Sequence, residues 1–225
     1  MSVVAAVTLP DGAILAADSR VRVERPDRQE EPPLHTDKIE TVKGRVCAAR
    51  FGIEESAAAA IAEIRERFDE LTTPQAIMDA QDAAVRAQMA ALSRRSEDFN
   101  PDHLGVGVVT AGLRGRVPFL AASVHHTAGI VGPILEERGG AAWLFGSGVT
   151  PEVRDNFGGL CNRVWDVCRW EQDQGPMNCR IRLLVDAIRE AFEQATRNEP
   201  KLTGGNYTMR IIREGFGGEA GGADD

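Results

Sequence analysis

The chain has 225 residues, of which 43% are hydrophobic and 27% are charged, and its formal net charge is −8. Such a composition is ordinary for a globular protein that buries one sizeable core. The acidic balance, with basic residues scattered along the chain, argues against nucleic acid as a main partner. No apolar run approaches the roughly 18 residues that span a bilayer, so we expect no membrane association. No secretory signal precedes the first predicted strand, and a cytoplasmic location is therefore expected.

The chain begins with a predicted β-hairpin. Two short apolar runs, Val3 to Leu9 and Ala13 to Ala17, flank the turn Pro10-Asp11-Gly12. Ser2 is small enough for methionine aminopeptidase to remove Met1, which would leave a serine with a free α-amine at the edge of a sheet. A hydroxyl and an amine on one residue are a nucleophile and a base already tethered together. The alternative is that Ser2 is an incidental small residue at the start of a strand.

The next elements are a loop, two strands and two helices. Residues 19–36 are polar and contain prolines, which predicts an exposed loop. The predicted strands are Lys38 to Val42 and Arg45 to Phe51. Helical apolar spacing predicts a helix over Glu54 to Leu71, and a cap followed by a first-turn proline predicts a second from Thr73-Pro74 to about Arg94.

The second half of the chain repeats this order. Strands are predicted over His103 to Thr110, Arg116 to Val124, Ala128 to Leu135 and Ala141 to Phe145. Two helices and a last strand follow, over about Pro151 to Gln172, Asn178 to Arg197 and Asn206 to Arg213. Strands grouped between helix pairs favour two antiparallel sheets over alternating βαβ units. We therefore predict an α+β fold with four αββα layers, as a single domain over residues 1–213, followed by a disordered Gly/Asp/Glu-rich tail over residues 214–225.

Cysteine and histidine spacings predict no metal site. The cysteines Cys47, Cys161, Cys168 and Cys179 contain no CxxC pair, and no histidine pair follows at zinc spacing. Buried free thiols are therefore expected. The adjacent His125 and His126 would point to opposite faces of a strand. No metal and no cofactor is predicted.

Three features suggest chemistry, although each has an ordinary explanation when taken alone. Besides Ser2, Asp18 ends an apolar strand, where a carboxylate usually caps or pairs, and Lys38 begins one, where a lysine is usually solvated. Together they resemble the proteasome β-type subunits, which are N-terminal nucleophile hydrolases, and among them the simpler bacterial proteasome-like peptidases. The matching motifs are Asp11-Gly12, Ala16-Ala17-Asp18-Ser19-Arg20, Lys38-Ile39, Cys47 to Gly52 and Gly146-Ser147-Gly148. The resemblance covers residues 2 to about 213, and counting back from Asp18 without a gap places the family's nucleophile on Ser2.

The resemblance implies a role for each matching residue. Ser2 Oγ would attack a peptide carbonyl while its own α-amine accepts the proton. Lys38 would lower the pKa of that amine, and Asp18 would hold Lys38 charged and oriented. The backbone N–H of Gly52 would face the developing oxyanion, and Ser147 would hydrogen-bond near the α-amine.

Two further residues follow from the resemblance with weaker motifs. Thr203 supplies the family's supporting hydroxyl, although Pro200 stands where the family has an acid, with Glu199 beside it. Arg50 occupies the position that lines the substrate pocket, where it would favour acidic side chains. The alternative is a strand residue that points elsewhere. This chain also has serine where the usual nucleophile is threonine.

The family implies how the protein would work. It would hydrolyse peptide bonds in peptides or unfolded proteins inside stacked homo-oligomeric rings, with an ATP-driven (AAA+) unfoldase as partner. Two alternatives stay open. One is a non-catalytic ring or scaffold subunit of the same fold, and the other is an N-terminal nucleophile amidohydrolase that acts on a small amide.

Overall fold

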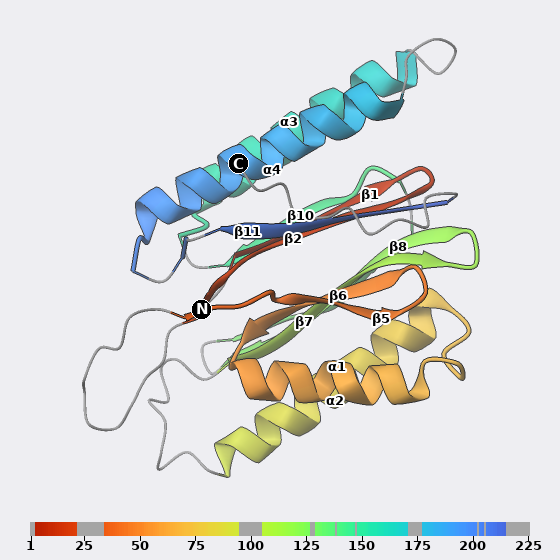
Figure 1. The fold of residues 1–225 in the computed structure, drawn as a ribbon, viewed down its shortest axis with the longest axis vertical. Coiled ribbons are helices and arrows are strands. Elements are labelled where there is room, and N and C mark those ends of the chain that lie inside the picture. Colours follow the sequence, from red (N-terminus) through yellow and green to blue (C-terminus); the bar gives the residue numbers. More distant parts are fainter. Residues whose placement is uncertain are drawn as a thin grey trace.

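Two antiparallel sheets lie between two pairs of helices (Figure 1). The computed structural model describes residues 3–21, 34–94, 105–126, 129–137, 139–146, 148–170, 177–201, 203–204 and 206–214. The four-stranded sheet contains, in spatial order, β10 (Ala142–Gly146), β1 (Val3–Leu9), β2 (Gly12–Asp18) and β11 (Tyr207–Arg213). The five-stranded sheet contains β5 (Ile39–Lys43), β6 (Val46–Gly52), β7 (Gly105–Arg114), β8 (Val117–His126) and β9 (Gly129–Glu136).

Each helix pair covers the outer face of one sheet. The helices α1 (Glu54–Arg67) and α2 (Pro74–Ser93) pack on the five-stranded sheet, and α3 (Pro151–Trp170) and α4 (Met177–Asn198) pack on the four-stranded sheet. The layers are therefore α, β, β and α, as the sequence predicts. None of the helices in the described part of the chain is long and apolar enough to cross a membrane.

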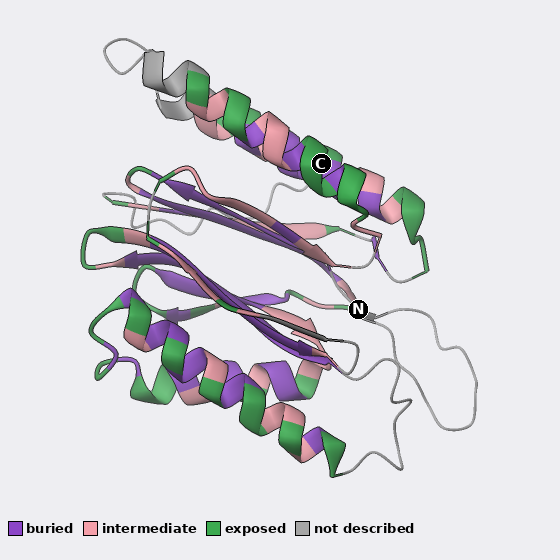
Figure 2. Ribbon diagram, turned by 180° about the vertical axis from the view of Figure 1, so that it is seen from behind, coloured by how far each residue is buried: buried purple, intermediate pink, exposed green. Residues whose placement is uncertain are grey.

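The opening hairpin lies at the centre of the sandwich. Every residue of β1 and β2 is buried, because these strands are covered on both faces (Figure 2). In β1, Val3, Ala5 and Val7 face α3 and α4, whereas Val4 and Ala6 face the five-stranded sheet. Burial on both faces explains why the first strands read as continuous apolar runs instead of alternating ones.

Element boundaries differ from the predicted ones at a few places. The expected loop over residues 19–36 begins and ends in a two-residue ribbon, β3 (Arg20–Val21) with β4 (Leu34–His35), and residues 22–33 lie outside the described part. Helix α1 ends at Arg67, before the predicted Leu71. Strand β7 continues past Thr110 to Arg114, because Gly112 stays in the ladder, where an added Cβ would lie 2.1 Å from the Arg45 carbonyl oxygen.

Other local predictions are confirmed. Thr73 caps α2, and its side-chain oxygen accepts a hydrogen bond from the Ala76 N–H at 3.1 Å, with Pro74 in the first turn. Cys47 and Cys161 are buried free thiols, and burial raises the pKa of the Cys161 thiol to about 12. The side chains of Cys168 and Cys179, and the tail beyond Glu214, lie outside the described residues.

Candidate active site

Asp18 anchors the start of the chain from the end of β2. Its side chain is 2% exposed, and its Oδ1 atom accepts a hydrogen bond from the Val3 N–H at 2.9 Å. The same oxygen pairs with Lys38 Nζ at 3.0 Å. A single carboxylate oxygen therefore fixes both the first described residue of β1 and the side chain of Lys38.

Lys38 is buried at the junction of the two sheets. It is 2% exposed and lies just before β5, from where its Nζ donates to Asp18 and to the backbone carbonyl of Arg20 in β3. The chain has 26 lysines and arginines, but only Lys38, Lys43 and Lys201 are lysines. The buried cation is therefore one of only three lysines in the chain. Unlike the guanidinium of arginine, the ammonium group of a lysine readily changes its pKa when it is buried.

Burial governs the electrostatics of this pair. Desolvation lowers the pKa of the Lys38 ammonium, against the attraction of Asp18, which raises it. Desolvation also raises the pKa of the Asp18 carboxyl, against Lys38 and the Val3 hydrogen bond, which lower it. The second oxygen of Asp18, Oδ2, is buried without a hydrogen-bond partner among the described residues. Lys38 therefore releases its proton more readily than a solvated lysine does.

Gly52 ends β6 at a position that only glycine fits. Its φ is +83°, which L side chains rarely adopt, and an added Cβ would lie 2.1 Å from the carbonyl oxygen of Gly105. The strand therefore ends with its backbone closely packed against β7. The assignment of its N–H to an oxyanion stays a prediction.

The turn after α4 carries Thr203 and is linked to Lys38 through Arg20. Thr203 is fully buried, and its hydroxyl lies within hydrogen-bonding distance of two carbonyl oxygens near the end of α4, at 2.9 Å from Glu199 and 3.3 Å from Ala195. The Arg20 guanidinium donates to the Pro200 carbonyl, while the Arg20 carbonyl accepts from Lys38. The same residue thus links the Thr203 turn to the buried ion pair.

The two predicted serines, Ser2 and Ser147, lie outside the described residues. Their chain neighbours are placed, however. Val3, which follows Ser2, is the register partner of Gly146, which precedes Ser147. The structure therefore brings together Asp18, Lys38 and the residue that follows Ser2, whereas the roles of both serines stay predictions.

Arg50 lies near the end of β6, and its side chain is 17% exposed. Its guanidinium pairs with Glu54 at 2.7 Å and donates to the backbone carbonyl of Asp37. Its expected role as a pocket residue that selects acidic substrates stays a prediction.

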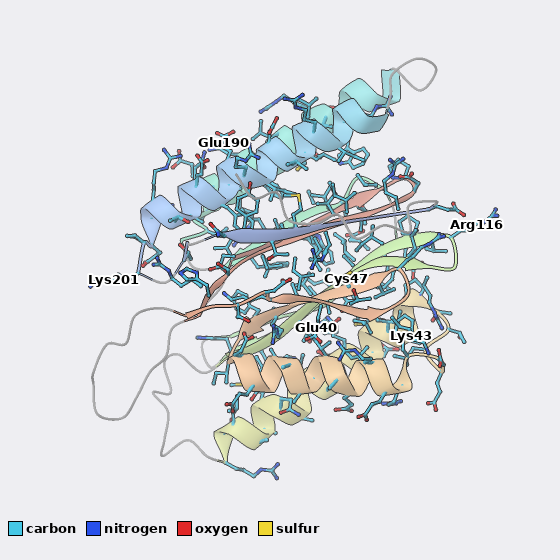
Figure 3. The ribbon with its side chains drawn as sticks, viewed as in Figure 1. Glu40, Lys43, Cys47, Arg116, Glu190 and Lys201 are labelled. Atoms are coloured by element: carbon cyan, nitrogen blue, oxygen red, sulfur yellow. The ribbon has the colours of Figure 1, made fainter. Side chains whose placement is uncertain are left out.

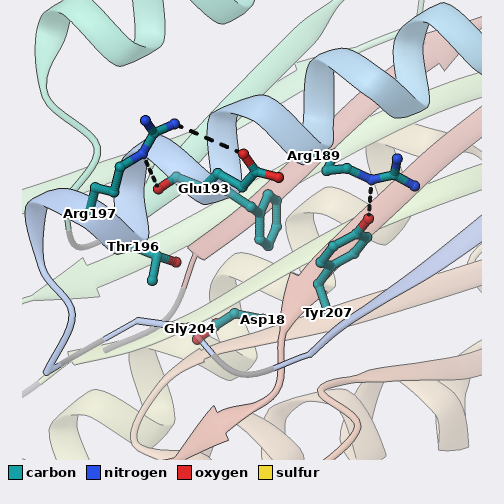
Figure 4. Close-up of a pocket in the computed structure, with 8 residues that line it drawn as sticks. Asp18, Arg189, Glu193, Thr196, Arg197, Gly204 and Tyr207 are labelled. Atoms are coloured by element: carbon teal, nitrogen blue, oxygen red, sulfur yellow. Dashed lines mark hydrogen bonds and ion pairs between the residues drawn. The ribbon is translucent and has the colours of Figure 1, made fainter. Parts of the chain in front are cut away.

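A cavity of about 320 Å³ opens on the α4 side of Asp18 (Figure 4). Its other described lining residues come from α4, β11 and the turn between them: Arg189, Phe192, Glu193, Thr196, Arg197, Gly204 and Tyr207. Arg189 Nε donates to the Tyr207 hydroxyl at 2.9 Å, and Arg197 Nη2 lies 3.9 Å from Glu193 Oε2. The volume falls at the lower end of the range for ligand pockets.

These cavity residues could not be predicted from the sequence. The apolar face of α4 was visible in its spacing, but the polar residues on its flank look like any solvated helix surface. Within the described residues, no group of three histidine, cysteine, aspartate or glutamate side chains is placed to hold a metal ion.

No protein-family model matches the sequence, and no curated protein matches it. Solved structures do match. The chain is similar to Anbu in the helical assembly of the Anbu complex from Pseudomonas aeruginosa, with a TM-score of 0.63 and 13% identity over 94% of this chain and 81% of that chain. It is also similar to Anbu, the ancestral beta-subunit, from Yersinia bercovieri, with a TM-score of 0.62 and 13% identity over the same shares.

A third structure, HslV from Trypanosoma brucei, has a TM-score of 0.56 and 13% identity over 94% of this chain and 99% of that chain. Likeness at this level of identity shows the fold. Anbu and HslV are proteasome-like and share the N-terminal nucleophile hydrolase fold. The resemblance expected from the opening hairpin is thus confirmed in three dimensions: the chain has the fold of the proteasome-like β-type family.

Proposed function

We propose that the protein is a proteasome-like peptidase that cleaves amide bonds with the hydroxyl of Ser2, after Met1 has been removed. The Asp18 carboxylate carries this proposal, because one of its oxygens binds both the Val3 N–H and Lys38 Nζ. Val3 follows Ser2 directly, so the proposed nucleophile is one peptide bond away from a residue held beside a buried cation. A buried ion pair with shifted pKa values is the kind of arrangement found at catalytic sites.

The proposed reaction begins with attack of Ser2 Oγ on a peptide carbonyl carbon, and the hydroxyl proton passes to the α-amine of the same residue. The tetrahedral intermediate then collapses to an ester on Ser2, and the proton passes to the departing amine. Water hydrolyses the ester and restores the Ser2 hydroxyl. When charged, Lys38 disfavours a second positive charge nearby, which keeps the α-amine in its basic form near neutral pH.

The backbone supports the developing charge in this proposal. The N–H of Gly52 donates to the oxyanion, which the rigid, closely packed end of β6 favours because a preorganised donor needs no rearrangement during the reaction. Ser147 assists proton movement at the α-amine. Thr203 stabilises the turn that follows α4, consistent with a hydroxyl that lies near the carbonyls at the end of that helix.

We further propose that copies of the chain assemble with one another around peptide or unfolded-protein substrates that an ATP-driven unfoldase delivers. The Anbu complex of Pseudomonas aeruginosa forms a helical assembly. Head-to-tail contacts between copies give a closed ring when the rotation closes and an open helix when it does not. Electron microscopy of the purified protein separates these two forms.

The test of the proposed activity is hydrolysis of an unstructured polypeptide, which needs no unfoldase. We expect Ser2→Ala to abolish turnover, since it removes the attacking atom. Ser19→Ala is the matched control, because it deletes a hydroxyl next to Asp18 that instead hydrogen-bonds His35 Nδ1 at 3.1 Å. Undiminished turnover by Ser2→Ala would contradict the proposal.

A further inference from the structure

Arg50 contacts the segment that carries Lys38 in two ways. Its backbone N–H donates to the Lys38 carbonyl at 3.0 Å. Its guanidinium donates to the carbonyl of Asp37, the residue before Lys38. Both peptide carbonyls that flank Lys38 are therefore bonded to one residue at the end of β6.

The charge of Arg50 is already compensated within the chain. Its Nη1 lies 2.7 Å from Glu54 Oε1 in the first turn of α1, and its Nε lies 4.0 Å from Glu40 Oε1 in β5. An acidic substrate side chain would compete with these carboxylates for the guanidinium. This arrangement favours a structural use of Arg50 over direct contact with substrate.

Asp37 is fixed from the other side as well. Its Oδ1 accepts the Ile39 N–H at 2.9 Å, and its Oδ2 pairs with Arg210 Nη2 at 3.2 Å. Arg210 belongs to β11 of the four-stranded sheet, so this contact crosses between the sheets. The chain before Lys38 is thus held by both sheets, and Arg50 supplies the contact from the five-stranded one.

We propose that Arg50, paired with Glu54, is a positioning residue for Lys38 and not a contact for the substrate. The pair orients the peptide that carries Lys38, and it places two opposite charges near the ammonium. The proposal rests on the proposed function only for its catalytic consequence, because the placement of Lys38 can be measured in a protein that hydrolyses nothing.

The electrostatic part of this role has a definite sign. The largest influence on the pKa of Lys38 is burial, which lowers it, followed by Asp18, which raises it. Glu54 also raises the pKa of Lys38, whereas Arg50 lowers it. Removal of Arg50 should therefore raise the pKa of Lys38, and removal of Glu54 should lower it.

The chain offers a clean way to observe this shift. Its only lysines are Lys38, Lys43 and Lys201, so a sample labelled with ¹³C at the lysine ε-carbon gives three NMR signals. Lys43 and Lys201 are exposed, lie on opposite sides of the molecule in Figure 3, and serve as internal references. The signal of Lys38 is followed as a function of pH.

We expect Arg50→Met to move the Lys38 titration to higher pH and Glu54→Gln to move it to lower pH. Arg65→Met is the matched control, because Arg65 also pairs with Glu40 but otherwise donates to the Thr41 carbonyl. We expect it to leave the Lys38 midpoint unchanged. Arg50→Lys keeps the positive charge but lacks the planar guanidinium group. We expect the Lys38 titration midpoint in this variant to lie close to that of the unsubstituted protein.

The outcomes separate the inference from the proposed activity. Shifts of the expected signs in a chain without peptidase activity would uphold the inference and count against the proposed function. An unmoved Lys38 midpoint in both Arg50→Met and Glu54→Gln, or an equal shift in Arg65→Met, would overturn the inference. Glu54 is 30% exposed, so Glu54→Gln keeps the test valid even if Arg50→Met does not fold.

Hydrolysis gives a second readout. We expect Arg50→Met to lower kcat by about 10- to 100-fold, with little change in KM, because small displacements of a catalytic group cost rates of this order. The loss should be equal for peptides with acidic and with neutral side chains before the cleaved bond. A loss confined to the acidic peptides, with Lys38 unmoved, would instead make Arg50 a substrate contact.

Discussion

The two helix pairs cover their sheets in different ways. Helix α2 is fastened to the five-stranded sheet by buried polar contacts as well as by apolar packing. Gln81 Nε2 donates to the Val108 carbonyl at 2.9 Å, and the Thr110 hydroxyl donates to Gln81. The next residue of the same helix, Asp82, accepts from Ser123 Oγ at 2.6 Å.

The other pair packs mainly through apolar side chains. Helices α3 and α4 cover β1, β2 and β10 with residues such as Phe157, Leu184 and Ile188. Near the end of α4, a cavity of about 320 Å³ separates the helix from Asp18. Directional hydrogen bonds fix one arrangement of a helix on a sheet, whereas apolar contacts are non-directional.

The two differently covered sheets lie on opposite sides of the candidate site. Gly52, Arg50 and the start of β5 belong to the side that the polar contacts fix. Asp18 and the N-terminal strand belong to the side that has a cavity. The structure therefore suggests a rigid platform for Lys38, facing a more open wall behind Asp18.

Loss of the ion pair between Lys38 and Asp18, which joins the two sides, should change activity and stability the most. Lys38→Met should abolish hydrolysis and leave assembly intact, and it should lower the free energy of unfolding by about 3–5 kcal/mol, because it leaves the Asp18 carboxyl buried without its partner. Peptide hydrolysis, particle size and urea denaturation measure the three quantities. Retained turnover would remove Lys38 from the mechanism.

A double variant sharpens this result. Replacing a whole buried ion pair by uncharged residues is often neutral for stability. We therefore expect Asp18→Asn with Lys38→Met to recover most of the lost stability and none of the activity. Recovery of hydrolysis would show that the pair only supports the fold.

A smaller effect is expected on the polar side alone. Gln81→Leu removes the partner of the Thr110 hydroxyl and one of the donors to the Val108 carbonyl, and a polar group left unbonded in the core costs about 1–3 kcal/mol. The urea midpoint should fall while the Lys38 NMR signal stays in place. Gln75→Leu, at an exposed position of the same helix, is the control and should change little.

The smallest effect is a pH dependence of stability. The pKa of Lys38 is lowered from 10.5, so the unfolded chain binds more protons between the lowered value and 10.5, and stability rises with pH there. The pKa of Asp18 is raised from 3.8, so its contribution falls as pH rises from 3.8 through the raised value. Urea midpoints across pH, compared with the double variant, should show both trends. The lowered pKa of Lys38 would be contradicted if the urea midpoints of the two proteins differed by the same amount at every pH in the alkaline range.

Much of the fold could be predicted because local patterns and packing agree. The Pro10-Asp11-Gly12 turn sets the hairpin, and Thr73 with Pro74 sets the start of α2. The extension of β7 could not be predicted, because a glycine at position 112 suggests a turn in the sequence. In the structure Gly112 lies within the strand, where the backbone next to β6 is too close for a side chain.

The site was predictable only in part, for a similar reason. The motif around Asp18 and the start of β5 predicted that Asp18 and Lys38 meet, and they do, at 3.0 Å. The pairing of Arg50 with Glu54 and Asp37 depends on how α1 and β5 are placed beside β6. The cavity behind Asp18 depends on the position of α4. Neither arrangement can be recognised from the spacing of residues along the sequence.

Ser2 is proposed to act as an N-terminal nucleophile, and the intact mass of the purified protein shows whether it does. The protein is measured with and without a peptide electrophile that captures N-terminal hydroxyls. We expect the loss of one methionine and a single adduct that maps to Ser2. A chain that keeps Met1 and forms no adduct would contradict the claim and favour a non-catalytic subunit of the same fold.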